Sequence, residues 1–170
     1  MWDCYRNATT GFVYVVFARF ISTTDHRYYY AVWNGVAWTK REIPNTSTAA
    51  IPNPTGGSVE FYYSPGICLD ASADGVIYCG IGPAYHGAQL YRMVTLDQGR
   101  TWSRQVISPP ARGGGARYTG ENFRPIVPRG RVSAKCAVIF ISGDYDDTSN
   151  ANPAIGGGYH GDFFTVALPT

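Results

Sequence analysis

The sequence predicts an all-β protein built from antiparallel sheets, and three observations lead to this prediction. Helical periodicity is nearly absent, because 20 glycines and 11 prolines interrupt the 170 residues too often for long helices. Short β-branched and aromatic runs recur between turn signals, and they fall into groups about 40–50 residues apart. The 45% apolar content and formal charge of +2 exclude a disordered chain. No apolar run reaches the roughly 20 residues of a membrane helix.

The first group of expected strands comprises residues 12–20, 27–33 and 36–43. Asn34 and Gly35 separate the last two runs, and Asn-Gly between aromatic-rich runs is a strong hairpin signal. This group has no clear first strand. A loop rich in proline, asparagine, threonine and glycine is expected over residues 44–58.

The second group comprises the expected strands 66–69, 76–81, 89–95 and 101–107. Cys68 and Cys79 flank a turn-rich stretch, and a hairpin centred between Ala73 and Asp74 would place their sulfur atoms directly opposite each other. The sequence therefore allows a cross-strand disulfide. The alternative is a pair of buried free thiols that pack as small hydrophobic groups.

The third group comprises the expected strands 123–127, 136–142 and 162–168, with loops over 108–120 and 143–158. Sets of four antiparallel strands at this period are typical of β-propeller blades. We therefore predict about three blades, over residues 1–44, 58–110 and 120–170, as part of a larger propeller. Three blades alone would leave two sheet faces uncovered.

Residues 95–102 read TLDQGRTW and carry the pattern Ser/Thr-x-Asp-x-Gly-x-Thr-Trp. Asp97 is expected to accept hydrogen bonds from backbone amides of the turn, and Gly99 permits a positive φ. Trp102 is expected to pack beneath the turn. The fixed positions are Thr95, Asp97, Gly99, Thr101 and Trp102. We expect a structural role for this turn, which joins the third and fourth strands of its sheet.

This motif resembles the Asp-box of sialidase-like propellers. Residues 27–38, with YYYAVWNG, residues 63–66, residues 122–128, with NFRPIVP, and residues 142–145 together resemble the BNR-4 family, which includes ulvan-type polysaccharide lyases. The resemblance covers most of residues 12–168. It implies a seven-bladed propeller of which this chain forms the C-terminal blades, the other blades coming from a missing N-terminal part or another chain.

The starts of the innermost strands are the candidate positions for chemistry. Arg124 can hold a uronate or sulfate group through two parallel hydrogen bonds, or it pairs structurally with Glu121 or Asp144. Tyr63 corresponds to a lyase tyrosine in the resemblance and is the candidate for proton transfer, or it stacks against a sugar. Further candidate substrate contacts are Tyr62, His86, Arg92, Asp144 and Tyr145.

Two functions follow from these residues. The chain binds or cleaves an acidic polysaccharide, as a polysaccharide lyase or glycoside hydrolase if it is an enzyme. Alternatively, it is a non-catalytic propeller that binds glycan or protein, such as an adhesin or a virion or tail receptor-binding element. We expect no cofactor; the acidic loop at Asp144, Asp146 and Asp147 offers oxygen ligands for Ca²⁺ as the alternative to a solvated loop.

The 12 arginines and 2 lysines are scattered, so we expect no nucleic-acid partner. The histidines at positions 26, 86 and 160 lack metal-ligand spacing and are expected in loops. We expect the protein outside the cell, at the cell surface or on a virion, although its N-terminus lacks the basic-then-apolar pattern of a signal peptide.

Overall fold

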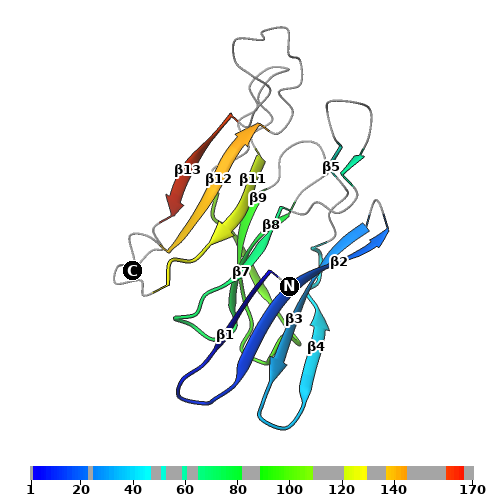
Figure 1. Cartoon of the computed structure of the whole chain (residues 1–170), viewed down its shortest axis with the longest axis vertical. Coiled ribbons are helices and arrows are strands. Elements are labelled where there is room, and N and C mark those ends of the chain that lie inside the picture. Colours follow the sequence, from blue (N-terminus) through cyan, green and yellow to red (C-terminus); the bar gives the residue numbers. More distant parts are fainter. Residues whose placement is uncertain are drawn as a thin grey trace, which may run out of the picture.

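The computed structural model describes residues 2–22, 25–46, 51–52, 59–60, 65–81, 89–108, 121–129, 137–144 and 160–166. Within these residues every regular element is a β-strand, and all pairings are antiparallel (Figure 1). The strands form two four-stranded sheets, one three-stranded sheet and one two-stranded sheet. The predicted all-β class is confirmed, and the sheets are open rather than closed into a barrel.

The first sheet has the order β1 (Asp3–Arg6), β2 (Val13–Ser22), β3 (Asp25–Trp33) and β4 (Trp38–Glu42). No sequence signal predicted β1, because it has only four residues, DCYR, none of them β-branched; pairing with β2 defines it. The β3–β4 hairpin pairs Trp33 with Trp38, so its connection has four residues rather than the two expected. The Asn34 side chain causes this, since its Oδ1 accepts hydrogen bonds from the amides of Val36 and Ala37.

The second sheet has the order β7 (Ile67–Leu69), β8 (Val76–Ile81), β9 (Gln89–Val94) and β10 (Ser103–Val106). Its register contradicts the cross-strand disulfide that the sequence allowed between Cys68 and Cys79 and agrees with the alternative of two buried free thiols. Cys68 pairs with Tyr78, whereas Cys79 pairs with Ile67, so the two thiols point to opposite faces. Both are buried free cysteines. Burial raises the pKa of the Cys79 thiol to about 12 and that of Cys68 well above its ordinary value.

The third sheet has the order β11 (Glu121–Ile126), β12 (Val138–Asp144) and β13 (His160–Val166). A separate hairpin, β5 (Ile51–Pro52) with β6 (Val59–Glu60), lies partly where the sequence analysis expected only a loop. His160 opens β13 and His26 lies within β3, where it is fully buried. The expectation that these two histidines occupy loops is therefore wrong.

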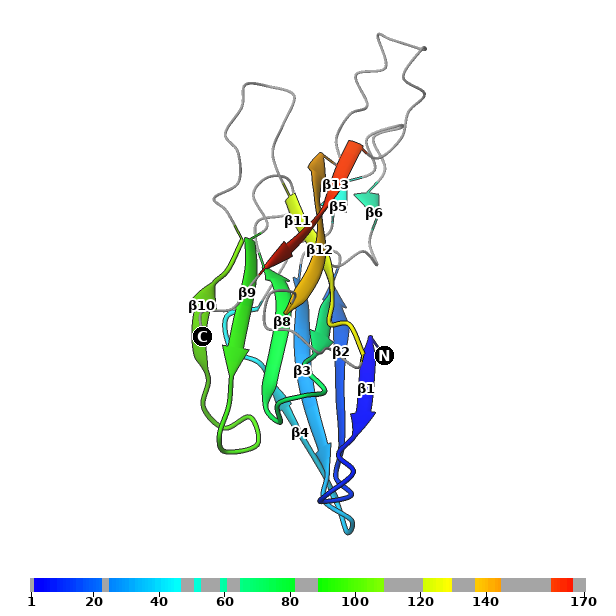
Figure 2. The same ribbon diagram turned by 90° about the vertical axis from the view of Figure 1, so that its left-hand side faces the viewer.

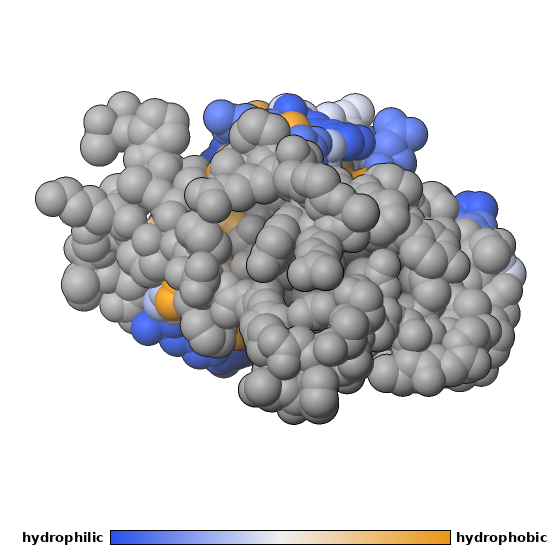
Figure 3. All heavy atoms as spheres, turned by 90° about the horizontal axis from the view of Figure 1, so that it is seen from above, coloured by the Kyte–Doolittle hydropathy of each residue, from blue (hydrophilic) through white to orange (hydrophobic). Residues whose placement is uncertain are grey.

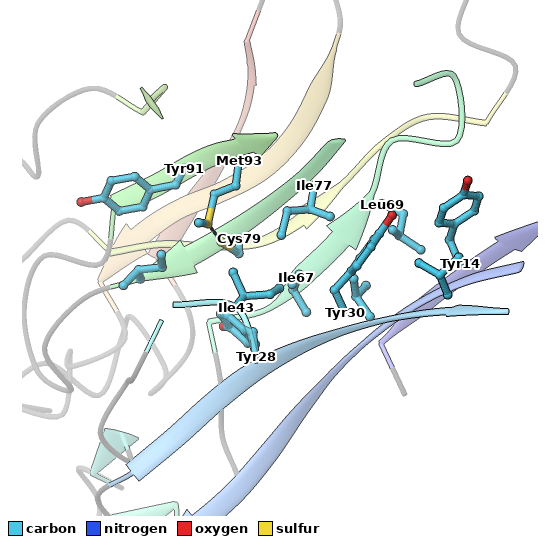
Figure 4. Packing of buried hydrophobic residues seen from close by; sticks show 13 residues of the cluster. Tyr14, Tyr28, Tyr30, Ile43, Ile67, Leu69, Ile77, Cys79, Tyr91 and Met93 are labelled. Atoms are coloured by element: carbon cyan, nitrogen blue, oxygen red, sulfur yellow. Dashed lines mark hydrogen bonds between the residues drawn. The ribbon is translucent and has the colours of Figure 1, made fainter. Parts of the chain in front are cut away.

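The first, second and third sheets are stacked face to face (Figure 2). One apolar cluster fills the space between the first and second sheets, as Figure 4 shows: Tyr14, Val16, Tyr28, Tyr30, Val32 and Ile43 meet Ile67, Leu69, Ile77, Cys79, Ile81, Tyr91 and Met93. A second cluster joins the opposite face of the second sheet to the third sheet and contains Cys68, Val76, Tyr78, Leu90, Val138 and Phe140. The second sheet is thus covered on both sides, which explains why every residue of β7 and β8 is buried.

Polar contacts fix how the first sheet sits on the second. The Tyr28 hydroxyl donates a hydrogen bond to the Gly80 carbonyl at 3.1 Å and accepts one from the Gly66 amide at 2.9 Å. A single buried phenol therefore binds both β8 and the residue before β7. Seen from above in Figure 3, the described residues in view are mostly hydrophilic, in keeping with an apolar interior gathered between the sheets. Among the described residues, no helix is long and apolar enough to cross a membrane.

Candidate functional site

The first strands of the three stacked sheets, β1, β7 and β11, lie side by side (Figure 1). Where they meet, a cavity of about 660 Å³ opens to solvent. Its lining combines Trp2 and Asp3 from the β1 side, the start of β7 with buried Cys68, and the segment from Arg124 to Arg129. A second hollow of about 450 Å³ continues along β1 past Tyr5 and Arg6. A volume of about 660 Å³ is typical of a small-ligand site, so we take the first cavity as the candidate functional site.

Arg124 lines this cavity because the backbone of β11 is irregular at that point. Its φ is +53°, in the left-handed region, and the register of β11 against β12 shifts between Phe123 and Ile126. A bulge of this kind changes the direction of a side chain, and here the Arg124 side chain is exposed while Pro125 is buried. The Arg124 amide donates a hydrogen bond to the Pro65 carbonyl, which fixes β11 against the chain entering β7.

Gly66 makes that close approach feasible. Its φ is +100°, and a Cβ placed on it would lie 3.2 Å from the Arg124 Cα and 3.3 Å from the Pro125 Cδ. A larger residue would therefore push β7 and β11 apart at the edge of the cavity. The residue type at position 66 thus sets the position of the Arg124 backbone.

Asp3 holds the opposite wall of the cavity. Its carboxylate accepts hydrogen bonds from the Cys4 amide at 2.8 Å and from the Leu69 amide at 3.0 Å, so β1 is fixed against β7. Arg129 lies 3.7 Å from the same carboxylate and also donates to the Cys4 carbonyl at 3.4 Å. The Arg129 side chain remains 78% exposed, so its guanidinium is held near the cavity while still facing water. Among the described lining residues, two arginines and one carboxylate give a net positive charge.

The turn that carries the Asp97 motif lies between β9 and β10, on the second sheet. Asp97 accepts hydrogen bonds from the amides of Arg100 and Thr101 at 3.0 and 2.8 Å and from the hydroxyls of Thr101 and Thr95 at 2.6 and 2.8 Å. These hydrogen bonds, with that of the Thr101 hydroxyl foremost, hold the pKa of the Asp97 carboxyl well below its usual range. The carboxylate is therefore charged and fully engaged within its own turn, as a structural role requires.

Gly99 and Trp102 dock this turn on the first sheet. Gly99 has φ +86°, and a Cβ at this residue would lie 3.0 Å from the Tyr30 ring. Trp102 meets Tyr30 edge to face, with ring centroids 5.3 Å apart. Trp102 thus packs against the cluster between the first two sheets, beneath the turn.

The residues predicted for chemistry are not brought together within the described part of the chain. Arg92 lies on β9, pairs with Tyr78 and Gln105 in the sheet, and does not line the cavity; its buried Nε has no hydrogen-bond partner among the described residues. Asp144 ends β12, and its backbone alone is described. Tyr62, Tyr63, His86 and Tyr145, with Asp146 and Asp147, lie outside the described residues.

The sequence analysis missed Trp2, Asp3 and Arg129 as cavity residues. No local pattern distinguishes them, because they become neighbours only when β1 packs beside β7. Among the described residues, no three histidine, cysteine, aspartate or glutamate side chains gather closely enough to hold a metal ion.

Comparisons with protein-family models, curated proteins and solved structures find no match to this chain. The functional conclusion therefore depends on the geometry of the cavity and on the stacked sheets.

Proposed function

We propose that the chain is part of a β-propeller and binds an acidic glycan in the cavity where β1, β7 and β11 meet. The single observation that supports this most is the cavity's composition: exposed Arg124 and Arg129 share it with Trp2, which is 41% exposed. Guanidinium groups bind carboxylate and sulfate through paired hydrogen bonds, and an exposed indole offers a flat apolar face to a sugar ring.

The architecture supports the propeller part of the proposal. Both four-stranded sheets run in sequence order from β1 to β4 and from β7 to β10. Of the first strands, β7 lies beside both β1 and β11, while the sheets pack face to face. This is the relation that successive propeller blades have to a common axis, and ligands of propellers bind near that axis.

The described lining carries groups suited to binding an acidic glycan. Its one carboxylate among the described residues, Asp3, accepts backbone hydrogen bonds from the Cys4 and Leu69 amides. Tyr63, the candidate for proton transfer, lies outside the described residues. We therefore propose glycan binding and make the lyase or glycosidase activity an outcome of the test.

Titration calorimetry with oligogalacturonate and with a neutral oligosaccharide of equal length tests this proposal. We expect the acidic oligosaccharide to bind and the neutral one not to bind. Arg124→Ala or Arg129→Ala should weaken binding of the acidic oligosaccharide by about 10- to 150-fold, since a charge-assisted hydrogen bond is worth roughly 1.5–3 kcal/mol. Arg100→Ala, on the exposed turn between β9 and β10, is the matched control and should bind normally. Equal binding of the neutral sugar, or unchanged affinity in both cavity variants, would contradict the proposal. Release of unsaturated uronate, seen by ultraviolet absorbance, would show cleavage instead.

A further inference from the structure

The first sheet has a second apolar face, directed away from the second sheet. Alternation along β2, β3 and β4 places one set of side chains in the core and the other set outward. We call the outward set the outer face; its apolar and aromatic members are Val13, Val15, Phe17, Tyr29, Ala31, Trp33 and Trp38, and its charged members are Arg19, Asp25, Arg27, Lys40 and Glu42.

The outer face has the composition of a covered surface. An antiparallel sheet with one face in water alternates apolar and polar residues, whereas a sheet covered on both faces has continuous apolar strands. Residues 13–18 of β2 read VYVVFA and contain no polar residue apart from the tyrosine that faces the core. Phe17 stacks on Tyr29 with centroids 5.4 Å apart, and Trp33 packs against Trp38 at 5.7 Å. Trp38 is still 54% exposed.

This face repeats the chemistry of a face that is already an interface. On the second sheet, Arg104 of β10 lies over the ring of Tyr91 of β9 at 3.9 Å, on the side that packs against the first sheet. On the outer face, Lys40 of β4 lies over the ring of Tyr29 of β3 at 5.9 Å.

The two cation–aromatic pairs occupy equivalent register positions. Arg104 pairs across the ladder with the residue two positions after Tyr91, and Lys40 pairs with the residue two positions after Tyr29. The outer face of the first sheet is therefore equivalent to the side of the second sheet that packs against the first sheet.

We propose that the outer face is the docking surface for a second copy of this chain, which presents the side of its β11–β13 sheet that is turned away from its own second sheet. Within each copy the first sheet already packs on the second and the second on the third, so this contact continues the same series. Ile139 of β12 is half-buried and lies on that side, because its neighbours Val138 and Phe140 face the second sheet. The proposal goes beyond glycan binding and does not depend on it.

The order of the faces favours this head-to-tail arrangement over pairing of two outer faces. Within the chain, the Tyr28 and Tyr30 face of the first sheet meets the Tyr91 and Met93 face of the second, so the contact joins two unlike faces. Charge does not decide between the arrangements, because the outer face carries carboxylates as well as cations: Glu42 accepts a hydrogen bond from the Tyr29 hydroxyl at 3.0 Å and lies 3.3 Å from Arg27. In a closed head-to-tail dimer, two identical interfaces related by a two-fold axis join the outer face of each chain to the β11–β13 sheet of the other.

Analytical ultracentrifugation of the full chain over a range of micromolar concentrations tests the proposal. We expect a species of twice the 18.6 kDa chain mass. Val15→Lys should lower the association constant of the dimer at least tenfold, and Ile139→Lys should lower it by a similar factor. Leu96→Lys, at a turn residue that is 96% exposed, is the matched apolar-to-lysine control and should dimerise normally. If Val15→Lys fails to fold, Trp38→Lys at the exposed margin of the outer face replaces it.

Each outcome is decisive. A monomer at every concentration overturns the proposal and leaves the outer face to a partner other than a second copy, such as a preceding sheet of a longer polypeptide or a glycan. A dimer that Val15→Lys or Trp38→Lys does not weaken also overturns it. A dimer that Val15→Lys or Trp38→Lys weakens, but that Ile139→Lys leaves unchanged, overturns the head-to-tail arrangement. Loss of the dimer in both the outer-face variant and Ile139→Lys, with Leu96→Lys still dimeric, supports the proposal.

Discussion

Asp74 joins the second sheet to the first, and its removal should loosen that contact. Asp74 lies in the turn between β7 and β8, and its carboxylate accepts hydrogen bonds from the Tyr5 hydroxyl at 2.5 Å, the Asn7 amide at 2.8 Å and the Tyr14 hydroxyl at 3.0 Å. The rings of Tyr5 and Tyr14 are stacked with centroids 5.0 Å apart. We define this group as the Asp74 clamp.

The cost of Asp74→Ala can be estimated from these three contacts. Hydrogen bonds to a charged acceptor contribute roughly 1.5–3 kcal/mol each, but solvent screening reduces the value at exposed Asp74 to about 1 kcal/mol. Because the three donors share one carboxylate, their contributions do not add fully, and we expect a total loss of about 2 kcal/mol. For a chain of this size that lowers the melting temperature by about 4–8 °C. Asp74→Asn, which keeps an acceptor oxygen, should lose less.

Thermal unfolding followed by circular dichroism measures this loss, and a double-mutant cycle assigns it. Tyr14→Phe removes only the hydroxyl, so the double variant with Asp74→Ala should be about 1 kcal/mol more stable than the sum of the single losses predicts. A melting temperature within 1 °C of the parent for Asp74→Ala, or full additivity in the cycle, would refute the clamp.

The clamp also has a pH dependence. Burial acts to raise the pKa of Asp74, but the hydrogen bonds from Tyr5, Asn7 and Tyr14 outweigh it, so the pKa in the folded state lies below its ordinary value. The contribution of the clamp is therefore present above about pH 4, the pKa of an unfolded aspartate, and is lost as the pH falls through the folded-state pKa. The stability difference between parent and Asp74→Ala should shrink over that acidic range.

Three further predictions concern single residues. Gly75→Ala should prevent stable folding, because φ is +77° at this position and the new Cβ would overlap a backbone carbonyl oxygen. Gly35→Ala is the comparison: φ is +95° there, but the space around it is open, so the free energy of unfolding should fall by only about 1–2 kcal/mol, as thermal unfolding can show. Gly99→Ala adds contact with an aromatic ring to the same backbone cost and should lower the melting temperature by about 4–8 °C; an unchanged value would contradict the docking of that turn. Cys68 and Cys79 should resist alkylation at pH 8 until urea unfolds the chain, as mass spectrometry of the labelled peptides can show; equal labelling before and after unfolding would contradict their burial.

The sequence predicted the grouping of strands well because turn signals and aromatic runs are local features. The second sheet illustrates this: its four strands lie within the runs expected between residues 66 and 107. The Asp97 turn could also be predicted from the sequence, since its hydrogen bonds all lie within eight residues.

What the sequence could not supply is register and long-range contact. The hairpin between β7 and β8 is centred on Ala73, half a residue from the expected centre between Ala73 and Asp74, because the Asp70 amide donates a hydrogen bond to the Val76 carbonyl. Each residue of β7 therefore pairs one position away from the expected partner. One position is enough to send Cys68 and Cys79 to opposite faces. The Asp74 clamp joins residues that are 60 to 69 positions apart in the sequence, and no local pattern predicts it.

The cavity residues could not be predicted from the sequence for the same reason. Arg124 was predicted at the start of an innermost strand and does line the cavity, but its positive φ and its contact with Gly66 follow only from the packing of β11 on β7. Asp3 lies on a strand that has no sequence signal of its own. A pattern reveals a strand, whereas the residues that share a cavity are set by how strands of different sheets meet.

The cavity and the proposed relation of the sheets to a common axis both require the face-to-face stacking of the first and second sheets. Nuclear Overhauser spectroscopy of protein with labelled isoleucine methyl groups tests it directly. We expect cross-peaks from the methyl groups of Ile67 and Ile77 to the ring protons of Tyr28 and Tyr30, because all four side chains are at most 2% exposed and lie in one cluster. Absence of these cross-peaks in a folded sample whose strand pairings are intact would contradict the stacking, and with it the cavity built upon it.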